Sequence, residues 1–213
     1  LKLVSSWGRQ QRPYLRKSLE SLAFSSMIID TSDWTLVDLV RHQAKAHGGR
    51  EFMTFEDGST LTFESLDRES DRLACNLSSL GVIPGDRVMA LLKNHIEFMF
   101  SLIATVKLGA IFVPVNTELK GIFLQHQFRN AEPRILFLDH DLRDAFDTVQ
   151  GGHANLTATI YVSGHVPDER SDVLANTAAM TFEEFSDLEG DIGDILATPG
   201  PRDIACIMYT SGT

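Results

Sequence analysis

The chain has 213 residues, 43% of them hydrophobic and 23% charged, which is the composition of an ordinary globular protein with one large or two small domains. Its formal net charge is −10, and thirteen acidic residues against two basic ones lie between residues 139 and 200. Such a surface argues against DNA or RNA as a partner, because nucleic-acid binding needs clustered lysine and arginine to replace counterions.

Residues 1–26 differ from the rest of the chain. They contain five basic residues against the single acid Glu20, and serine is frequent. This composition is typical of a mitochondrial transit peptide. Pro13 interrupts any helix there, and the alternative is a translated upstream stretch with the true start at Met27. We therefore expect no fold in residues 1–26 and a domain over residues 27–213.

The first part of this domain is predicted to be helical with one hairpin. Ser32 or Asp33 is the expected cap of a helix that ends at Gly48-Gly49. A hairpin is predicted around the turn pair Asp57-Gly58, followed by a helix over residues 66–80. Asn94 with Glu97 resembles a capping pair for a further helix that ends at Gly109.

From residue 86 onward, apolar runs and amphipathic segments alternate strictly. Further helices are predicted over residues 118–130 and 142–149, and a short one at 182–185 within a polar excursion over residues 163–200. Strands are predicted at residues 88–92, 111–115, 135–138, 159–162 and 204–208. These runs are apolar throughout, which is typical of strands covered on both faces. The pattern predicts right-handed crossovers and an α/β fold with a mostly parallel sheet.

Two features indicate the cytosol rather than a membrane or the cell exterior. The apolar stretch 98–115 contains Lys107 near its middle, which costs about 2.5–3.5 kcal/mol on membrane insertion. It is therefore read as a core helix and a core strand. Cys75 and Cys206 stand beside apolar residues, and two buried thiols fit a reducing compartment.

Several common site motifs are absent from the sequence. It has no Gly-x4-Gly-Lys-Ser/Thr phosphate loop, no Gly-x-Gly-x-x-Gly after a strand, no Gly-x-Ser-x-Gly elbow and no His-Glu-x-x-His. Asp139-His140-Asp141 contains acid–base residues. It stands between a predicted strand and a predicted helix, so a helix-capping role is favoured over acid–base catalysis.

The end of the chain carries the most specific chemistry. Residues 204–208 read as a buried strand, and Tyr209-Thr210-Ser211-Gly212-Thr213 follows directly. A turn of hydroxyl residues and glycine at a strand end offers backbone N–H and side-chain O–H groups to one point, which suits a phosphate.

In its sequence context this tail resembles the phosphate loop of the adenylate-forming enzymes, which include acyl-CoA synthetases, luciferases and peptide-synthetase adenylation domains. Three earlier segments also resemble that family, in the family's order. They are Leu61-Thr62-Phe63-Glu64-Ser65-Leu66, in which Ser65 replaces the usual acid, Gly85-Asp86-Arg87-Val88, and residues 106–116. The plain Pro-Val-Asn ending at Asn116 favours acyl-CoA ligases, of the carnitine-CoA or fatty-acyl-CoA type, over peptide synthetases.

The resemblance implies the N-terminal part of an AMP-binding domain in a cytoplasmic ligase. Its substrates would be a carboxylic acid, ATP and coenzyme A, with Mg²⁺. It implies phosphate binding by Thr210, Ser211, Gly212 and Thr213, with Thr210 also near Mg²⁺. The rest of the family's loop and its catalytic lysine would follow residue 213, so residues 1–213 alone are expected to be inactive.

Three alternatives remain open at this point. The first is a non-catalytic binding module that kept the fold. The second is a different adenylate-forming enzyme, such as a peptide-synthetase domain. The third is an unrelated α/β nucleotide-binding domain.

Overall fold

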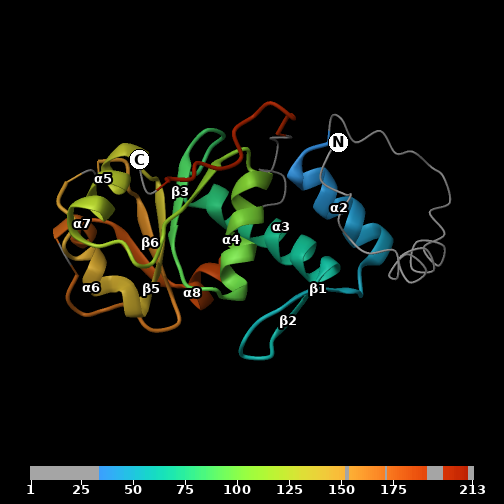
Figure 1. Ribbon diagram of the computed structural model, residues 1–213, viewed down its shortest axis with the longest axis horizontal. Helices are drawn as coiled ribbons and strands as arrows, with labels where there is room; N and C mark the ends of the chain where they lie inside the picture. The colour runs from blue at the N-terminus through green and yellow to red at the C-terminus, as the bar shows by residue number, and fades with distance from the viewer. Residues whose placement is uncertain (1–33, 152–153, 171, 191–198, 211–213) are drawn as a thin grey trace, which may run out of the picture. The chain divides into compact units, whose positions relative to one another are not determined.

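The computed structural model describes residues 34–210, except 152–153, 171 and 191–198 (Figure 1). The expected boundary at residue 27 lies outside these residues. The cap candidates Ser32 and Asp33 lie outside them too.

Five strands form one parallel sheet in the order β4-β3-β5-β6-β7. They are β3 Arg87–Leu91, β4 Ile111–Pro114, β5 Ile135–Asp139, β6 Ala158–Val162 and β7 Ala178–Thr181. The predicted α/β fold with a parallel sheet is confirmed. Strand β7 falls in the stretch over residues 163–200 that was expected to be a polar excursion, so this strand was not predicted from the sequence.

The apolar runs explain why these strands lie inside the sheet. Every residue of β5 and β6 is buried, as are four of the five residues of β3. The chain moves outward from β3 to β4, then returns past β3 to build β5, β6 and β7 on the other side. This reversal puts crossover helices on both faces and creates a topological switch point between β3 and β5.

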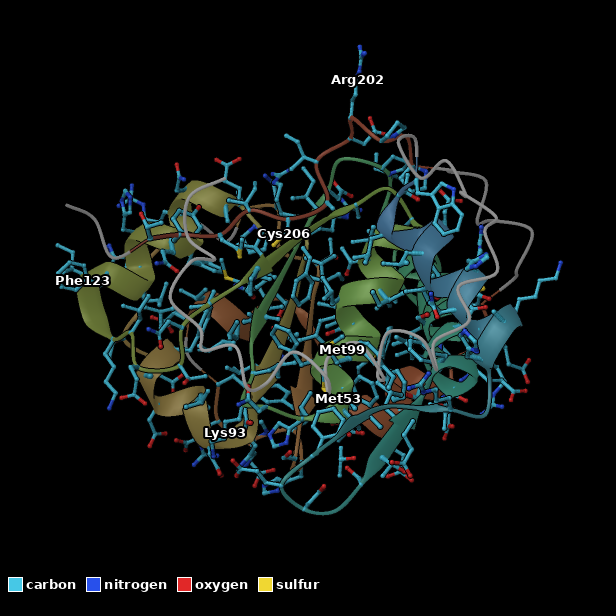
Figure 2. All side chains as sticks on the ribbon, turned by 45° about the vertical axis from the view of Figure 1, so that its right-hand side comes forward. Met53, Lys93, Met99, Phe123, Arg202 and Cys206 are labelled. Carbon is cyan, nitrogen blue, oxygen red and sulfur yellow. The ribbon has the colours of Figure 1, made fainter. Side chains whose placement is uncertain are left out.

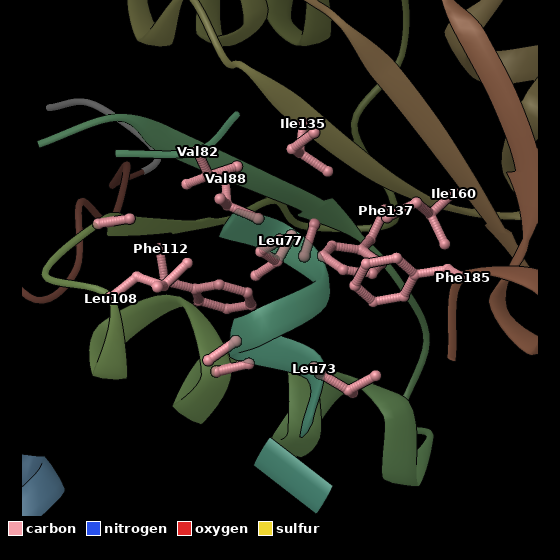
Figure 3. Close-up of a cluster of buried hydrophobic side chains, with 14 of the residues drawn as sticks. Leu73, Leu77, Val82, Val88, Leu108, Phe112, Ile135, Phe137, Ile160 and Phe185 are labelled. Atoms are coloured by element: carbon pink, nitrogen blue, oxygen red, sulfur yellow. The ribbon is translucent and has the colours of Figure 1, made fainter. Parts of the chain in front are cut away.

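One face of the sheet is covered by α3 Phe63–Ser79, α4 Ile96–Lys107 and the short α8 Phe182–Ser186. A buried apolar cluster fills the space beneath them, and Figure 3 shows Phe112, Phe137 and Phe185 in it. The rings of Phe137 and Phe185 meet edge to face at 5.6 Å, a favourable geometry for aromatic pairs.

The other face is covered by α5 Gly121–Ala131, the 3₁₀ turn η1 His140–Leu142, α6 Arg143–Phe146 and α7 Asp172–Ala175. Phe128 and Phe146 pack edge to face at 5.0 Å in the cluster on this side. The expected helix over residues 142–149 is thus shorter and starts with a 3₁₀ turn.

Helix α2, Leu36–His47, precedes a two-stranded hairpin of β1 Glu51–Thr54 and β2 Thr60–Thr62. The N-cap of α2 is Thr35, which corrects the expectation of Ser32 or Asp33. Thr35 Oγ1 accepts from the Asp38 N–H at 3.2 Å, and the Thr35 N–H donates to Asp38 Oδ2 at 2.9 Å. This reciprocal capping box fixes the start of the helix.

The expected cap at Asn94 is wrong. The N-cap of α4 is His95, and its side chain makes no capping hydrogen bond. Its imidazole instead contacts Asp139 on the neighbouring strand. Helix α5 begins at Gly121 rather than near Glu118, since Asn116 Oδ1 accepts from the Glu118 N–H at 3.0 Å and forms a turn there.

Candidate functional site

The segment before the predicted phosphate-binding residues lies at the edge of the sheet, beside β4. A single parallel bridge joins Cys206 to Phe112 (Figure 2 labels Cys206). The Phe112 N–H donates to Ala205 O at 3.0 Å, and the Ile207 N–H donates to Phe112 O at 2.9 Å. The expected buried strand over residues 204–208 is therefore reduced to one bridge. Ile204 and Met208 are 60% and 76% exposed, because the segment has a partner strand on one side only.

The side chains of this segment alternate between the two faces of the sheet. Cys206 packs against the cluster under α3 and α4, whereas Ile207 and Tyr209 pack against the cluster under α5. Cys206 is half-buried rather than buried as expected, and its desolvation raises the pKa of the thiol.

The Tyr209 hydroxyl ties the segment to α5. Asn130 Nδ2 donates to Tyr209 Oη at 2.9 Å, and Tyr209 Oη donates to the Gln127 carbonyl at 3.5 Å. The next residue, Thr210, is exposed. Ser211, Gly212 and Thr213 lie outside the described residues, so their role as phosphate ligands stays a prediction.

Two of the family-like segments contact each other, and one of them also connects the sheet to α5. The Gly85 N–H donates to the Gly109 carbonyl at 2.9 Å, which brings the two segments into contact. Arg87 Nε donates to Ala131 O at 2.8 Å, and Arg87 Nη2 donates to Glu132 O at 2.9 Å. This arginine therefore satisfies carbonyl groups at the C-terminal end of α5, which have no partner within the helix.

The segment with the unusual Ser65 is also structural. Ser65 Oγ accepts from the Thr62 N–H at 3.0 Å, and Thr62 Oγ1 accepts from the Ser65 N–H at 3.1 Å. The serine thus completes the capping box of α3 in place of the usual acid.

A cluster of polar side chains lies at the switch point between β3 and β5, and its members are Lys93, His95, Asp139 and Asp141. Nε2 of His95 lies 2.7 Å from Oδ2 of the buried Asp139, and Lys93 Nζ donates to Asp141 Oδ2 at 2.7 Å. Asp139 also accepts from the Asp141 N–H at 3.2 Å, so the expected capping role of this aspartate is confirmed. His95 was not among the residues expected from the sequence to form a site. The available signal was that polar residues follow two strands that become neighbours in the sheet.

Lys93 and Asp141 in this cluster form an ion pair with opposite charges. The hydrogen bond to Asp141 raises the pKa of Lys93, and the same bond lowers the pKa of Asp141. Parallel sheets commonly bind ligands in the crevice at such a point. Here the Lys93–Asp141 ion pair and the His95–Asp139 hydrogen bond bridge it.

Ser163 lies near this cluster but does not form a catalytic triad with it. Its Oγ is 3.5 Å from His95 Nε2, the same ring nitrogen that contacts Asp139. A Ser-His-Asp relay requires the serine and the aspartate on different nitrogens of the imidazole. The geometry therefore gives no support to a serine hydrolase.

An apolar pocket of about 320 Å³ lies elsewhere, among residues of α2, β1, α3 and α4. Its lining includes Val40, Phe52 and Met99, and Gln43 is the one polar residue among the lining side chains. A carboxylate is held best by a cation or by several N–H donors. We therefore assign no acid substrate to this pocket.

Two further observations concern the part of the chain that the structure describes. Within it, no helix has the length and apolar character that crossing a bilayer requires. Across those same residues, no three His, Cys, Asp or Glu side chains come close enough to hold a metal ion.

Comparison with known protein families identifies the chain. The model of the family described as AMP-binding enzyme matches residues 40–213. The chain belongs to this family. The AMP-binding enzymes are AMP-forming ligases of the acyl-CoA ligase and peptide-synthetase superfamily, and their use of ATP is common to them.

Individual relatives divide between several kinds of AMP-binding enzyme. A fatty acid–[acyl-carrier-protein] ligase, ScoC of Streptomyces coeruleorubidus, is 39% identical over 40% of the chain and 16% of its own length. Feruloyl-CoA synthase of an Amycolatopsis species is 31% identical over 73% of the chain and 27% of its own length. The nonribosomal peptide synthetase sidC of Arthroderma benhamiae is 30% identical over 57% of the chain and 3% of its own length.

Among solved structures, the anthranilate-CoA ligase AuaEII in complex with anthranoyl-AMP superposes with a TM-score of 0.69 at 21% identity. The match covers 84% of the chain and 33% of that structure, and it confirms the fold. The chain thus spans about a third or less of the length of these relatives.

Proposed function

We propose that the chain is the N-terminal part of an ATP-dependent acyl-CoA ligase. The observation that carries this proposal is the family match over residues 40–213. The match ends in the hydroxyl-rich tail, which follows in sequence the segment bridged to β4 through Cys206. In the proposed reaction a carboxylate attacks the α-phosphate of ATP and gives an acyl-adenylate and pyrophosphate. The thiol of coenzyme A then displaces AMP.

The proposed role of the tail is to hold the β- and γ-phosphates while the α-phosphate is attacked. Thr210, Ser211 and Thr213 would donate O–H groups to phosphate oxygens, and Gly212 would let the backbone approach closely. The exposure of Thr210 supports this role, because an exposed residue can contact a ligand.

Mg²⁺ would offset the charge of the phosphates. In such sites it keeps several waters and takes few ligands from the protein. A single hydroxyl from Thr210 fits that pattern.

Coenzyme A as the acceptor is supported by the similarity to feruloyl-CoA synthase, which covers 73% of the chain. The Pro114-Val115-Asn116 sequence, which favours acyl-CoA ligases over peptide synthetases, agrees with coenzyme A as the acceptor. Two other relatives are a fatty acid–[acyl-carrier-protein] ligase and a nonribosomal peptide synthetase, which would correspond to an acyl carrier protein and a peptide-synthetase carrier as acceptors. These are the second candidates for the thiol that receives the acyl group.

The proposal is tested in the whole protein to which the chain belongs. Acid-dependent exchange of labelled pyrophosphate into ATP, measured across aliphatic, aromatic and amino acids, reports adenylation. Coenzyme A, acyl carrier protein and phosphopantetheine are then compared as acceptors. If none of the acids in the panel supports pyrophosphate exchange, the result would contradict an adenylate-forming enzyme and favour a non-catalytic module. Exchange followed by transfer to a carrier alone would exclude a CoA ligase. Residues 1–213 by themselves are expected to form no acyl-CoA.

A further inference from the structure

We propose that Tyr209 and Asn130 form an anchor that positions the phosphate-binding loop. The proposal rests on the function proposed above, and it adds two positioning residues that lie outside the loop itself. The carrying observation is the hydrogen bond from Asn130 Nδ2 to Tyr209 Oη, 2.9 Å long, directly before Thr210.

The anchor stands at the point where the tail leaves the sheet. Backbone pairing with β4 ends at the Ile207 N–H. Beyond Ile207, the hydrogen bonds of the described tail are the two made by the Tyr209 hydroxyl. The position of Thr210 therefore depends on where this tyrosine is held.

Helix α5 supplies a rigid base for the anchor. Leu124 and Phe128 are fully buried, so the helix is fixed against the sheet. Its C-terminal carbonyl groups at Ala131 and Glu132 are bound by Arg87 of β3. A chain of contacts thus runs from Arg87 through the end of α5 to Asn130, Tyr209 and Thr210.

The ring and the hydroxyl of Tyr209 make different contacts, so packing and hydrogen bonding can be tested separately. Its ring packs against the cluster under α5, and its hydroxyl both accepts from Asn130 and donates to the Gln127 carbonyl. Phenylalanine at position 209 would keep the packing and lose both hydrogen bonds. The substitution therefore tests positioning without removing the apolar contact.

The test uses Tyr209→Phe, Asn130→Ala and Asn130→Asp in the whole protein, with Arg129→Ala as the matched control on the exposed face of α5. Pyrophosphate exchange gives kcat and the KM for the acid. We expect Asn130→Ala to lower kcat about two- to tenfold, the rate equivalent of one neutral hydrogen bond, with the KM for the acid unchanged. Tyr209→Phe loses two hydrogen bonds and should lower kcat by at least as much. Asn130→Asp should retain activity, because the tyrosine O–H can turn from the Gln127 carbonyl to the new carboxylate and keep residues 209 and 130 joined. Arg129→Ala should match the wild type.

A second measurement separates failure of the anchor from failure of the proposed function. Hydrogen exchange of the peptide covering residues 206–210 is compared between wild type and Tyr209→Phe. The anchor predicts faster exchange in this peptide alone, with the peptides of α5 and β4 unchanged. If the wild type shows no pyrophosphate exchange, the proposed function fails and this measurement decides the anchor. The anchor would be overturned if hydrogen exchange of the 206–210 peptide is unchanged in Tyr209→Phe. It would also be overturned if an active enzyme keeps its kcat in both Tyr209→Phe and Asn130→Ala.

Discussion

The fully buried ammonium of Lys107 at the end of α4 lies 2.6 Å from Oδ1 of Asp67 on α3. It also donates to the Asp67 carbonyl at 2.8 Å and to Asp71 Oδ1 at 2.7 Å. The one charge that argued against a membrane span in the apolar stretch 98–115 therefore lies in the protein interior. There it joins the two longest helices of its face of the sheet.

This arrangement predicts an asymmetry between the two sides of the ion pair. The double variant Asp67→Asn with Asp71→Asn leaves Lys107 buried without a carboxylate. It should lower the free energy of unfolding by roughly 3–5 kcal/mol. Lys107→Met should cost less, because the aspartate side chains are 23% and 40% exposed and water can solvate them. Urea unfolding of each variant measures both values, with the exposed Asp144→Asn as control. A larger loss for Lys107→Met would show that the lysine is not dependent on its partners.

Asn76 of α3 should be a second structural determinant. Its side chain is fully buried, donates to Phe185 O at 2.9 Å and to Ser186 O at 3.2 Å, and accepts from the Gly190 N–H at 3.2 Å. Asn76→Ala should lower the free energy of unfolding by about 1–3 kcal/mol, because buried polar groups lose their partners. Chemical denaturation checks this value. The exposed Arg68→Ala on the same helix should stay close to wild type, and equal losses for the two would contradict the assignment.

The Lys93–Asp141 pair should contribute to the free energy of unfolding near neutral pH and lose this contribution at both acid and alkaline pH. The hydrogen bond lowers the pKa of Asp141 from 3.8, so its contribution is present above that value and is lost as the pH falls through the lowered pKa. The same bond raises the pKa of Lys93 from 10.5, so its contribution is present below that value and is lost as the pH rises through the raised pKa.

Melting temperatures of wild type and Asp141→Asn, measured from pH 2 to pH 8, check the acid limb. The two proteins should differ at neutral pH and converge at the acid end. Because the pair is exposed, 0.5 M salt should also shrink the difference. A difference that stays constant over this pH range would show that the pair contributes nothing.

The proposed phosphate loop predicts a kinetic effect rather than a stability effect. In the whole protein, Thr210→Ala and Thr213→Ala should lower the adenylation rate more than they raise the KM for the acid. A hydrogen bond to a charged phosphate is worth about 1.5–3 kcal/mol, which corresponds to about one to two decades of rate. Pyrophosphate exchange and melting temperature are measured on the same preparations. Lower melting temperatures with unchanged exchange would mean that the threonines only form a turn.

The sheet was predictable where burial leaves a strong signal. Residues 135–138 and 159–162 are apolar throughout, because both faces of a central parallel strand are covered. The edge of the sheet was not predictable in this way. Strand β7 consists of Ala178–Thr181, exposed or half-buried at every position, and was missed. Residues 204–208 are as apolar as a central strand, yet they form one bridge at the edge.

Helix ends show a similar division. Gly48-Gly49 and Asp57-Gly58 marked chain reversals correctly, because their preferences are local. Asn94 looked like a cap, but the tertiary contact with Asp139 fixes His95 at that position instead.

By itself the sequence determined the alternation of strands and helices, the parallel sheet and the family, since each of these depends on residues close together in the chain. Tertiary structure alone decided the pairs that organise the candidate sites. Lys107 and Asp67 are 40 residues apart, His95 and Asp139 are 44 apart, and Asn130 and Tyr209 are 79 apart. No periodicity or local motif encodes such pairs. They form because the crossovers of a parallel sheet bring distant strand ends and helix ends together in space.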